Sequence, residues 1–203
     1  MACPQWEILS CLYGRPQVQC SEIQERTATA VIRERNLMSK LSLHIYGDEV
    51  LRKKTRFVKK FDKKLMQFIE DMFDLMYEAG GIGLAAPQVG ILKKVLVVDT
   101  LEEGEQCALV NPKIIWSGGE LVRMKEGCLS IPGVEAEVVR SELIRVRHDD
   151  PESGEELILE AGGLLSRVIQ HEIDHLNGIL FVDHLRPSQL SLINRKLQEL
   201  TAA

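Results

Sequence analysis

The sequence has no long apolar run, no paired cysteine pattern and no internal repeat. A stretch of about eighteen apolar residues, the length that a membrane-spanning helix needs, does not occur, so we predict no membrane span. The start, MACPQWEILSCLYGRPQ, lacks a basic segment followed by a clean apolar stretch and is a poor secretory signal. The five cysteines have no paired short spacing. They give no disulfide framework and indicate a reducing compartment, for which we predict the cytoplasm.

An excess of basic charge is also missing. The formal net charge of -5 argues against a non-specific nucleic-acid binder, which would neutralise phosphates with a basic surface. We therefore expect no sequence-specific nucleic-acid partner. The length of 203 residues, with 45% hydrophobic and 27% charged residues, suits one globular domain with a sizeable core.

The first 37 residues differ from the remainder of the chain. They contain three of the five cysteines and no lysine, and arginines alternate with glutamates in EIQERTATAVIRER. An organellar leader would be nearly free of acids. We expect residues 1–37 to be a dispensable N-terminal extension, disordered or absent from the mature protein, and residues 38–203 to form a single domain.

Helical and strand patterns alternate along residues 38–203. Asp62 stands at an N-cap position, Gly80-Gly81 ends the pattern, and the apolar residues between them have helical spacing: Leu65, Phe68, Ile69, Met72, Leu75 and Met76. Short strands are predicted at 93–100, 108–115, 119–126, 135–140, 142–150 and 155–161, separated by turn signals such as Gly118-Gly119 and Pro132-Gly133. Two helices are predicted at 163–177 and 187–200. We expect an α+β fold in which antiparallel strands pack around a buried helix carrying HEIDH, with an N-terminal and a C-terminal helix.

The stretch HEIDH, residues 171–175, has the spacing of a metal site. On a helix, His171 and His175 lie one turn apart on the same face, and Glu172 lies about 100° round the helix beside them. This arrangement suits two nitrogen ligands next to a carboxylate that moves protons; the alternative is a solvated helix face. The flanking residues are apolar, so the helix is buried and its histidines need partners, which a metal would supply. Asp174 needs a partner too, and Arg140 is the candidate.

A catalytic site of this kind takes three protein ligands and leaves one position to water. His184 lies beyond the predicted helix end at Gly178 and is a poor third ligand. Cys128, in KEGCLSIPG, is the better one, although a free cysteine is more often a small buried hydrophobe. One sulfur and two nitrogens suit iron(II), zinc, cobalt or nickel rather than calcium or magnesium.

The stretch GGIGLAAPQVG, residues 80–90, is rich in glycine but is not a phosphate loop, because it lacks the lysine and the hydroxyl residue. Gly81 and Gly83 indicate main chain that runs close to a ligand. Gln88 offers an amide donor for a developing oxyanion. Taken alone, the stretch is better interpreted as a glycine-rich connection between a helix and a strand.

Together, GIGLAAPQ, EGCLS and QHEIDH resemble, in this order, the three signature motifs of peptide deformylases, and the resemblance covers nearly all of residues 39–185. It implies a single metal-dependent catalytic domain that removes the formyl group of N-formylmethionine from nascent polypeptides and releases formate. By motif position, Cys128, His171 and His175 would bind the metal. The resemblance implies Fe²⁺, for which Zn²⁺, Ni²⁺ or Co²⁺ can substitute. Glu172 would be the general base and then the general acid.

The resemblance also implies how the substrate is held. Gln88 and the backbone N–H of Leu129 would stabilise the oxyanion, and Gly83 would make main-chain contacts. An apolar pocket for the methionine side chain is expected from Ile82, Leu129, Leu164 and Val168. Glu135 departs from the pattern, because some relatives carry a basic residue there that helps to hold the peptide.

The C-terminal segment LSLINRKLQEL reads as an amphipathic helix with Leu192, Ile193, Leu197 and Leu200 on its apolar side. In bacterial relatives a helix here can approach the ribosome, whereas its alternative role is to pack on its own domain. Two other functions stay open at this point. One is a zinc peptidase that uses the His-Glu-x-x-His helix, and the other is a silent binding protein with a structural metal. The second would need four ligands and no Glu172.

Overall fold

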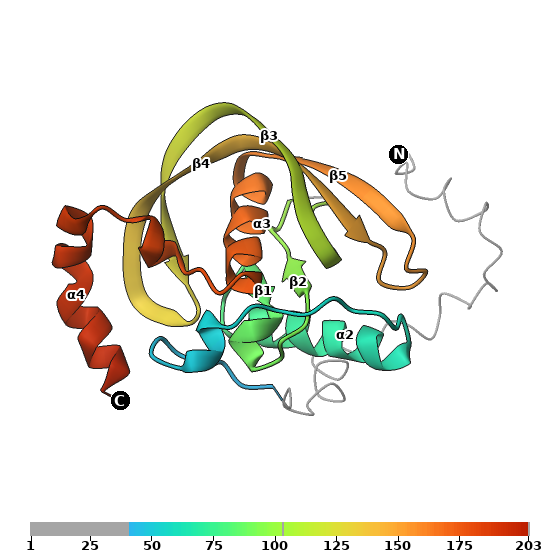
Figure 1. The fold of residues 1–203 in the computed structure, drawn as a ribbon, viewed down its shortest axis with the longest axis horizontal. Coiled ribbons are helices and arrows are strands. Elements are labelled where there is room, and N and C mark those ends of the chain that lie inside the picture. Colours follow the sequence, from blue (N-terminus) through green and yellow to red (C-terminus); the bar gives the residue numbers. More distant parts are fainter. Residues whose placement is uncertain (1–40, 103, 203) are drawn as a thin grey trace, which may run out of the picture. The chain divides into compact units, whose positions relative to one another are not determined.

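The computed structural model describes residues 41–102 and 104–202, which belong to one compact unit running from Ser39 to Ala203 (Figure 1). The predicted extension, residues 1–37, lies outside the described residues. The helices are α2 (Lys63–Glu78), α3 (Gly163–Leu176) and α4 (Pro187–Thr201), with 3-10 turns η3 (Glu49–Arg52), η4 (Ala86–Val89) and η5 (Phe181–His184). The strands are β1 (Gly83–Ala85), β2 (Val95–Val98), β3 (Cys107–Cys128), β4 (Ile131–Asp149) and β5 (Glu156–Gly162). The predicted α+β class is confirmed.

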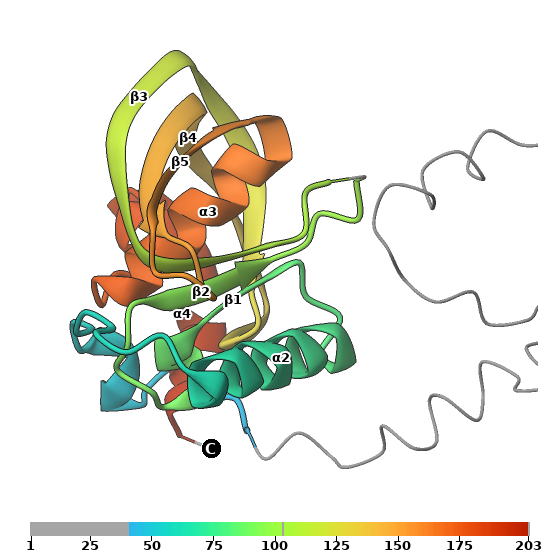
Figure 2. The ribbon, with the colours of Figure 1, turned by 90° about the vertical axis from the view of Figure 1, so that its right-hand side faces the viewer.

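All five strands form one antiparallel sheet in the order β1-β2-β3-β4-β5. The long strands β3 and β4 arch over α3, and α2 runs alongside β1 and β2 (Figures 1 and 2). Strand β2 is buried on both faces: Leu96 and Val98 join the core around α3, whereas Val95 and Val97 join the core around α2. This double burial is why the segment has an uninterrupted apolar run rather than an alternating pattern.

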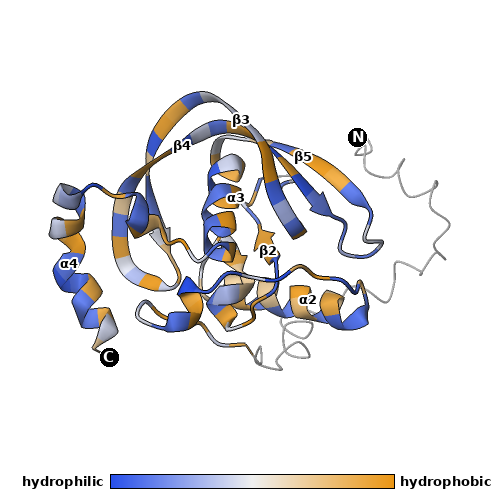
Figure 3. Ribbon diagram, viewed as in Figure 1, coloured by the Kyte–Doolittle hydropathy of each residue, from blue (hydrophilic) through white to orange (hydrophobic). Residues whose placement is uncertain are grey.

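Two predicted strand breaks are wrong. Strand β3 continues through Gly118-Gly119, and β4 continues through Ser141. The break predicted at Pro132-Gly133 exists, but it lies at Leu129-Ser130, so Pro132-Gly133 falls inside β4. The pairing register shifts between Gly118 and Leu121, so the extra residues are taken up as an irregularity within the ribbon. Such bulges bend a strand and increase its twist without ending it. Alternating hydrophilic and hydrophobic residues are visible along both strands (Figure 3).

Helix α2 begins where the sequence predicts. The Asp62 side chain accepts hydrogen bonds from the backbone N–H groups of Lys64 and Leu65, which satisfies two of the free donors at the helix start. The apolar stripe of the helix is buried through Leu65, Ile69, Met72 and Met76. The stripe therefore packs in the core, as its spacing predicts.

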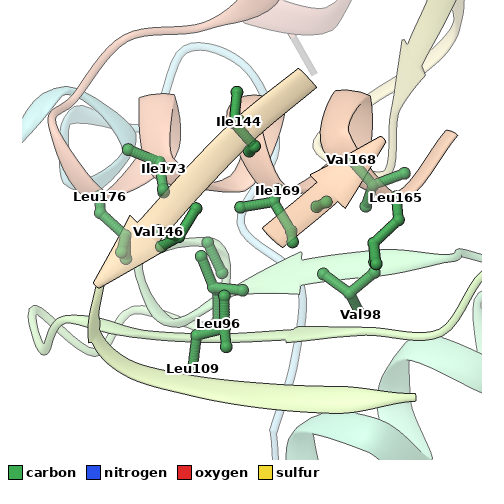
Figure 4. Close-up of a cluster of buried hydrophobic side chains, with 12 residues drawn as sticks. Leu96, Val98, Leu109, Ile144, Val146, Leu165, Val168, Ile169, Ile173 and Leu176 are labelled. Carbon is green, nitrogen blue, oxygen red and sulfur yellow. The ribbon is translucent and has the colours of Figure 1, made fainter. Parts of the chain in front are cut away.

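Helix α3 is enclosed by the sheet (Figure 4). Its apolar side chains contact Leu96, Val98 and Leu109 on one side and Ile144 and Val146 on another; they are Leu165, Val168, Ile169, Ile173 and Leu176. Each fully buried side chain of this kind contributes about 1.5–3 kcal/mol. This packing fixes the rotation of the helix and hence the direction in which its histidines point.

Helix α4 packs on its own domain through three of the four residues predicted for its apolar side, and only Leu192 was placed wrongly. Leu192 is 84% exposed, whereas Leu197 is buried and Leu190, Ile193 and Leu200 pack against the same cluster. The reason is helical spacing: positions 190, 193, 197 and 200 follow one stripe, from which position 192 is turned by about 100°. None of the described helices has the length and apolarity needed to cross a membrane.

Candidate active site

Two chain segments bring Cys128, His171 and His175 together. Cys128 ends β3, and the two histidines lie one turn apart on α3. The ligand atoms that the three residues offer all lie within 4.8 Å of one another, and Cys128 Sγ is 3.2 Å from His175 Nε2. The imidazole rings are 5.0 Å apart, centre to centre. The structure therefore brings the three predicted ligands to one point.

The donor set fits a transition-metal ion. Burial lowers the pKa of His175 well below its ordinary value, so the ring is neutral, and its Nδ1 is buried without a hydrogen-bond partner. His171 Nδ1 lies 3.0 Å from Glu126 Oε2, which leaves the other ring nitrogen free to bind an ion. Two imidazole nitrogens and a cysteine sulfur suit iron(II), zinc, nickel or cobalt.

Glu172 lies beside this group on α3. Its carboxylate is buried, and Oε2 has no hydrogen-bond partner. Burial raises the pKa of Glu172 to about 7, and a carboxyl group with such a pKa can take up and release a proton at neutral pH. The main chain of β1 passes directly over it, because a Cβ on Gly83 would lie 2.5 Å from Glu172 Oε1. Glycine is required at position 83 for this close approach.

Gln88 directs its amide N–H group toward the same point from η4. Its Oε1 accepts a hydrogen bond of 2.7 Å from the Ala85 backbone, which fixes the orientation of the amide. Its Nε2 then lies 3.2 Å from Ser130 Oγ and 3.6 Å from Cys128 Sγ. The backbone N–H of Leu129 donates to no other group in the described part of the chain. Two N–H donors thus border the cysteine.

A pocket of about 490 Å³ opens onto these groups. It is lined by Ile82, Gly83, Gln88, Cys128, Leu129, Leu164, Val168, His171 and Glu172. His175, the remaining residue of the predicted site, is 1% exposed and is not part of the lining. Leu129 also supports the wall, because a Cβ on Gly81 would lie 2.7 Å from its side chain. The four residues expected to enclose the methionine side chain, Ile82, Leu129, Leu164 and Val168, therefore line one pocket.

A buried ionic network, which the sequence analysis did not assign, holds His171. Glu126 accepts hydrogen bonds from Arg140 Nε at 2.6 Å, Arg140 Nη2 at 2.9 Å and Arg167 Nη1 at 2.6 Å. Burial would raise the pKa of Glu126, but its hydrogen bonds with His171 and Arg140 hold that pKa at about 2. The carboxylate is thus ionised and can orient the ring of His171.

The network continues to the surface through Asp174. Arg140 Nη1 donates to Asp174 Oδ2 at 2.7 Å, which confirms the partner expected for this aspartate. His184 Nε2 lies 2.7 Å from the same oxygen. His184 therefore contacts Asp174 and does not belong to the group that could hold a metal.

The polypeptide deformylase family model matches residues 40–191. The chain belongs to this family. It is 51% identical over 148 residues to peptide deformylase 1 of Clostridium acetobutylicum, covering 73% of this chain and 96% of the relative. It is 52% identical over 146 residues to peptide deformylase of Caldicellulosiruptor bescii, covering 72% and 86%.

Solved deformylase structures share the fold. The peptide deformylase of Legionella pneumophila matches with a TM-score of 0.73 and 42% identity, over 80% of this chain and 95% of that chain. The enzyme of Synechococcus elongatus, solved in complex with actinonin, matches with a TM-score of 0.71 and 44% identity, over 81% and 87%.

The chain is accordingly a metal-dependent amide hydrolase that removes the N-terminal formyl group from N-formylmethionine of nascent polypeptides. Membership of this family favours deformylation over both alternatives, the zinc peptidase and the silent binding protein.

Proposed function

We propose that Cys128, His171 and His175 bind the catalytic metal of this deformylase and that Glu172 moves the proton in formamide hydrolysis. The observation that carries the proposal is the meeting of the three ligand atoms within 4.8 Å at the pocket, beside a buried carboxylate oxygen that has no partner. When bound, the ion would polarise the formyl group and lower the pKa of a coordinated water from about 15.7 toward 7.

The residues of the chain would act in a fixed order. Glu172 takes a proton from the attacking water and later returns it to the methionyl amine, so that formate and a free N-terminus leave. Negative charge develops on the former formyl oxygen, where the amide of Gln88 and the N–H of Leu129 would meet it. One such donor contributes about 3–4 kcal/mol to the stability of the transition state.

Substrate binding follows from the shape of the pocket. Ile82, Leu129, Leu164 and Val168 would enclose the methionine side chain, because they form the apolar part of the lining. Strand β1 is an edge strand that pairs only with β2, so its free edge at Gly83 can pair with the backbone of an extended peptide. Selectivity for methionine comes from this pocket, since the formyl group itself offers little surface.

The variant Glu172→Gln tests the role of the carboxylate. We expect it to bind the metal with one equivalent, as the unchanged protein does, and to release formate from formyl-Met-Ala-Ser at least about 100-fold more slowly. Glu160→Gln, on the exposed side of β5, is the matched control and keeps full activity. Full activity of Glu172→Gln with metal bound would refute the assignment.

The ion proposed is Fe²⁺, with Zn²⁺, Ni²⁺ or Co²⁺ as substitutes. The mixed sulfur and nitrogen donors support this set, because hard ions such as calcium and magnesium prefer oxygen ligands. Protein purified without oxygen and loaded with each ion in turn would be assayed for formate release. The highest activity is expected with Fe²⁺, and equal activity with Mg²⁺ would contradict the site.

We further place the enzyme in the cytoplasm, with residues 38–203 as its catalytic domain and residues 1–37 as a dispensable extension. Cys107 and Cys128 are both free thiols, in keeping with a reducing compartment. A chain that begins at Met38 should retain the activity of the full chain, and a fluorescent fusion should report the compartment.

Ribosome contact is proposed for the outer side of α4. Leu192 and Arg195 point away from the domain, with the side chain of Arg195 92% exposed. Arg195 pairs with Glu199 one turn further along α4, and this exposed ion pair beside an apolar side chain can contact ribosomal RNA or protein. We expect the enzyme to co-sediment with ribosomes at low salt, and Arg195→Glu to weaken this association without changing formate release from peptides.

A further inference from the structure

Among the charged residues that line the pocket, only Lys125 is exposed. Glu126 and Arg167 are buried and bond to each other, and Glu172 is buried beside the metal ligands. A peptide bound with its methionine in the pocket would extend out of the pocket past one exposed charge of the lining, the ammonium group of Lys125.

The Lys125 ammonium has no counter-ion in residues 41–102 and 104–202. Its cross-strand neighbour, Glu137, lies 3.7 Å from Arg123 instead. Glu135 is the other carboxylate close by, since its Cγ lies 3.7 Å from where a Cβ on Gly127 would be, but it forms no ion pair with Lys125. The ammonium group is thus free to pair with a charge on a bound peptide.

A second ammonium group lies on the same rim. Lys196, from α4, donates a hydrogen bond to the backbone oxygen of Gly133, which also lines the pocket. Because Lys125 lies on β3 and Lys196 on α4, the two charges come from separate parts of the fold. Two ammonium groups thus lie at or beside the pocket, with the Glu135 carboxylate near Gly127.

An extended peptide that ran from Cys128 along residues 125–128 would bring its second and third residues close to Lys125. Residues 125–128 of β3 pair with β4 on one edge and border the pocket on the other, opposite the free edge of β1. Lys125 is two residues from Gly127, which is about 6.6 Å along a strand, and an extended peptide advances by about 3.3 Å per residue. One residue of such a peptide would lie beside Gly127. A peptide residue up to two positions further along can thus reach the ammonium group of Lys125.

We infer that Lys125 is a specificity-determining residue of this deformylase and favours substrates with an acidic side chain at the second or third position, directly after formyl-methionine. The inference rests on the proposed function, because it needs formyl-methionine in the pocket described above. Charges arranged in this way act on substrate choice and on KM more than on the chemical step.

The test compares C-terminally amidated peptides, so that no terminal carboxylate interferes. Formyl-Met-Ala-Ser is the neutral reference, and glutamate, glutamine or lysine is placed in turn at position two and at position three. For the unchanged protein we expect kcat/KM for glutamate to exceed that for lysine by about two- to five-fold at one position or both, carried by KM and weakening as salt is added. Lys125→Met should make kcat/KM for the glutamate and lysine peptides about equal, and Lys125→Glu should make kcat/KM higher for the lysine peptide.

Two variants control for effects other than charge at this point. Lys113→Met removes an exposed lysine from β3 outside the pocket and should leave the ratio unchanged. Glu135→Gln removes the opposing carboxylate and should raise the ratio. The inference would be overturned if the unchanged protein had a glutamate-to-lysine ratio of kcat/KM near one, or if the preference for glutamate survived in Lys125→Met. Formate release from the neutral peptide would still support the proposed function in either case. No formate from any peptide would overturn both.

Discussion

Replacing Glu126 with glutamine would keep the shape of the side chain and remove its charge. In the folded protein this carboxylate accepts three hydrogen bonds from two buried guanidinium groups and lies 3.0 Å from His171. Breaking a buried ion pair by removing one partner costs about 3–5 kcal/mol, because the remaining charges stay buried without compensation. We expect Glu126→Gln to lose this much stability in the metal-free protein.

The same variant should weaken metal binding. Glu126 orients the ring of His171, and the loss of such a partner costs about 10- to 100-fold in metal affinity. Urea unfolding of the metal-free protein measures the loss of stability. Competition with a chromophoric chelator measures the loss of metal affinity. The two measurements separate the support of the fold from the support of the ligand.

Glu160→Gln is the matched control, since it removes a carboxylate from an ion pair of similar length on the exposed side of the same sheet. Arg145 Nε lies 2.7 Å from Glu160 Oε1, but the two side chains are 52% and 69% exposed. An exposed pair of this kind contributes at most about 1 kcal/mol. If both variants lose the same small amount of stability and bind metal equally well, the reasoning from burial is wrong.

Three further outcomes are expected. Gly83→Ala should fold but lose at least about ten-fold in kcat, because its Cβ would lie 2.5 Å from Glu172 Oε1 and displace the carboxylate; circular dichroism and formate release check this. When the metal-free protein is exposed to peroxide and then reloaded with metal, loss of activity should follow oxidation of Cys128 rather than Cys107, since burial raises the pKa of Cys107 to about 11 and keeps it a thiol. Peptide mass spectrometry distinguishes the two, and earlier oxidation of Cys107 would contradict the prediction. Asn111→Ala should cost about 2–3 kcal/mol in urea unfolding, because the buried amide makes three hydrogen bonds and holds its backbone at a φ of 54°.

The residues that the structure brings together around Cys128 were predictable from the sequence, and for a chemical reason. A metal needs ligands of particular types, and the helical repeat places His171 and His175 on one face without knowledge of the fold. Cys128 and Gln88 come from distant segments, and only the joint match to three motifs placed them beside the histidines. Their meeting point depends on the sheet, which no local pattern shows.

Short-range signals predicted the wrong structure where tertiary packing decided the outcome. Gly118-Gly119 carries the signature of a turn, yet the ribbon of β3 and β4 absorbs it as a register shift. Leu192 was placed on the apolar side of α4 because it is apolar, but the stripe that fits the domain runs through Leu190 and Ile193. In both cases the residue type was weighed more heavily than its position within a longer element.

The buried ionic network around Glu126 shows what could have been predicted if β4 had been recognised as one uninterrupted strand. In β4 the even positions face inward, and Val138, Ile144 and Val146 are all buried. Arg140 has the same parity, so side-chain alternation alone places its guanidinium beneath the helix rather than in solvent. The supposed break at Ser141 cut the strand in two and hid this parity. Because a buried arginine requires carboxylates within reach, the unbroken strand would have pointed from Arg140 to Glu126 as well as to Asp174, and hence to the residue that orients His171.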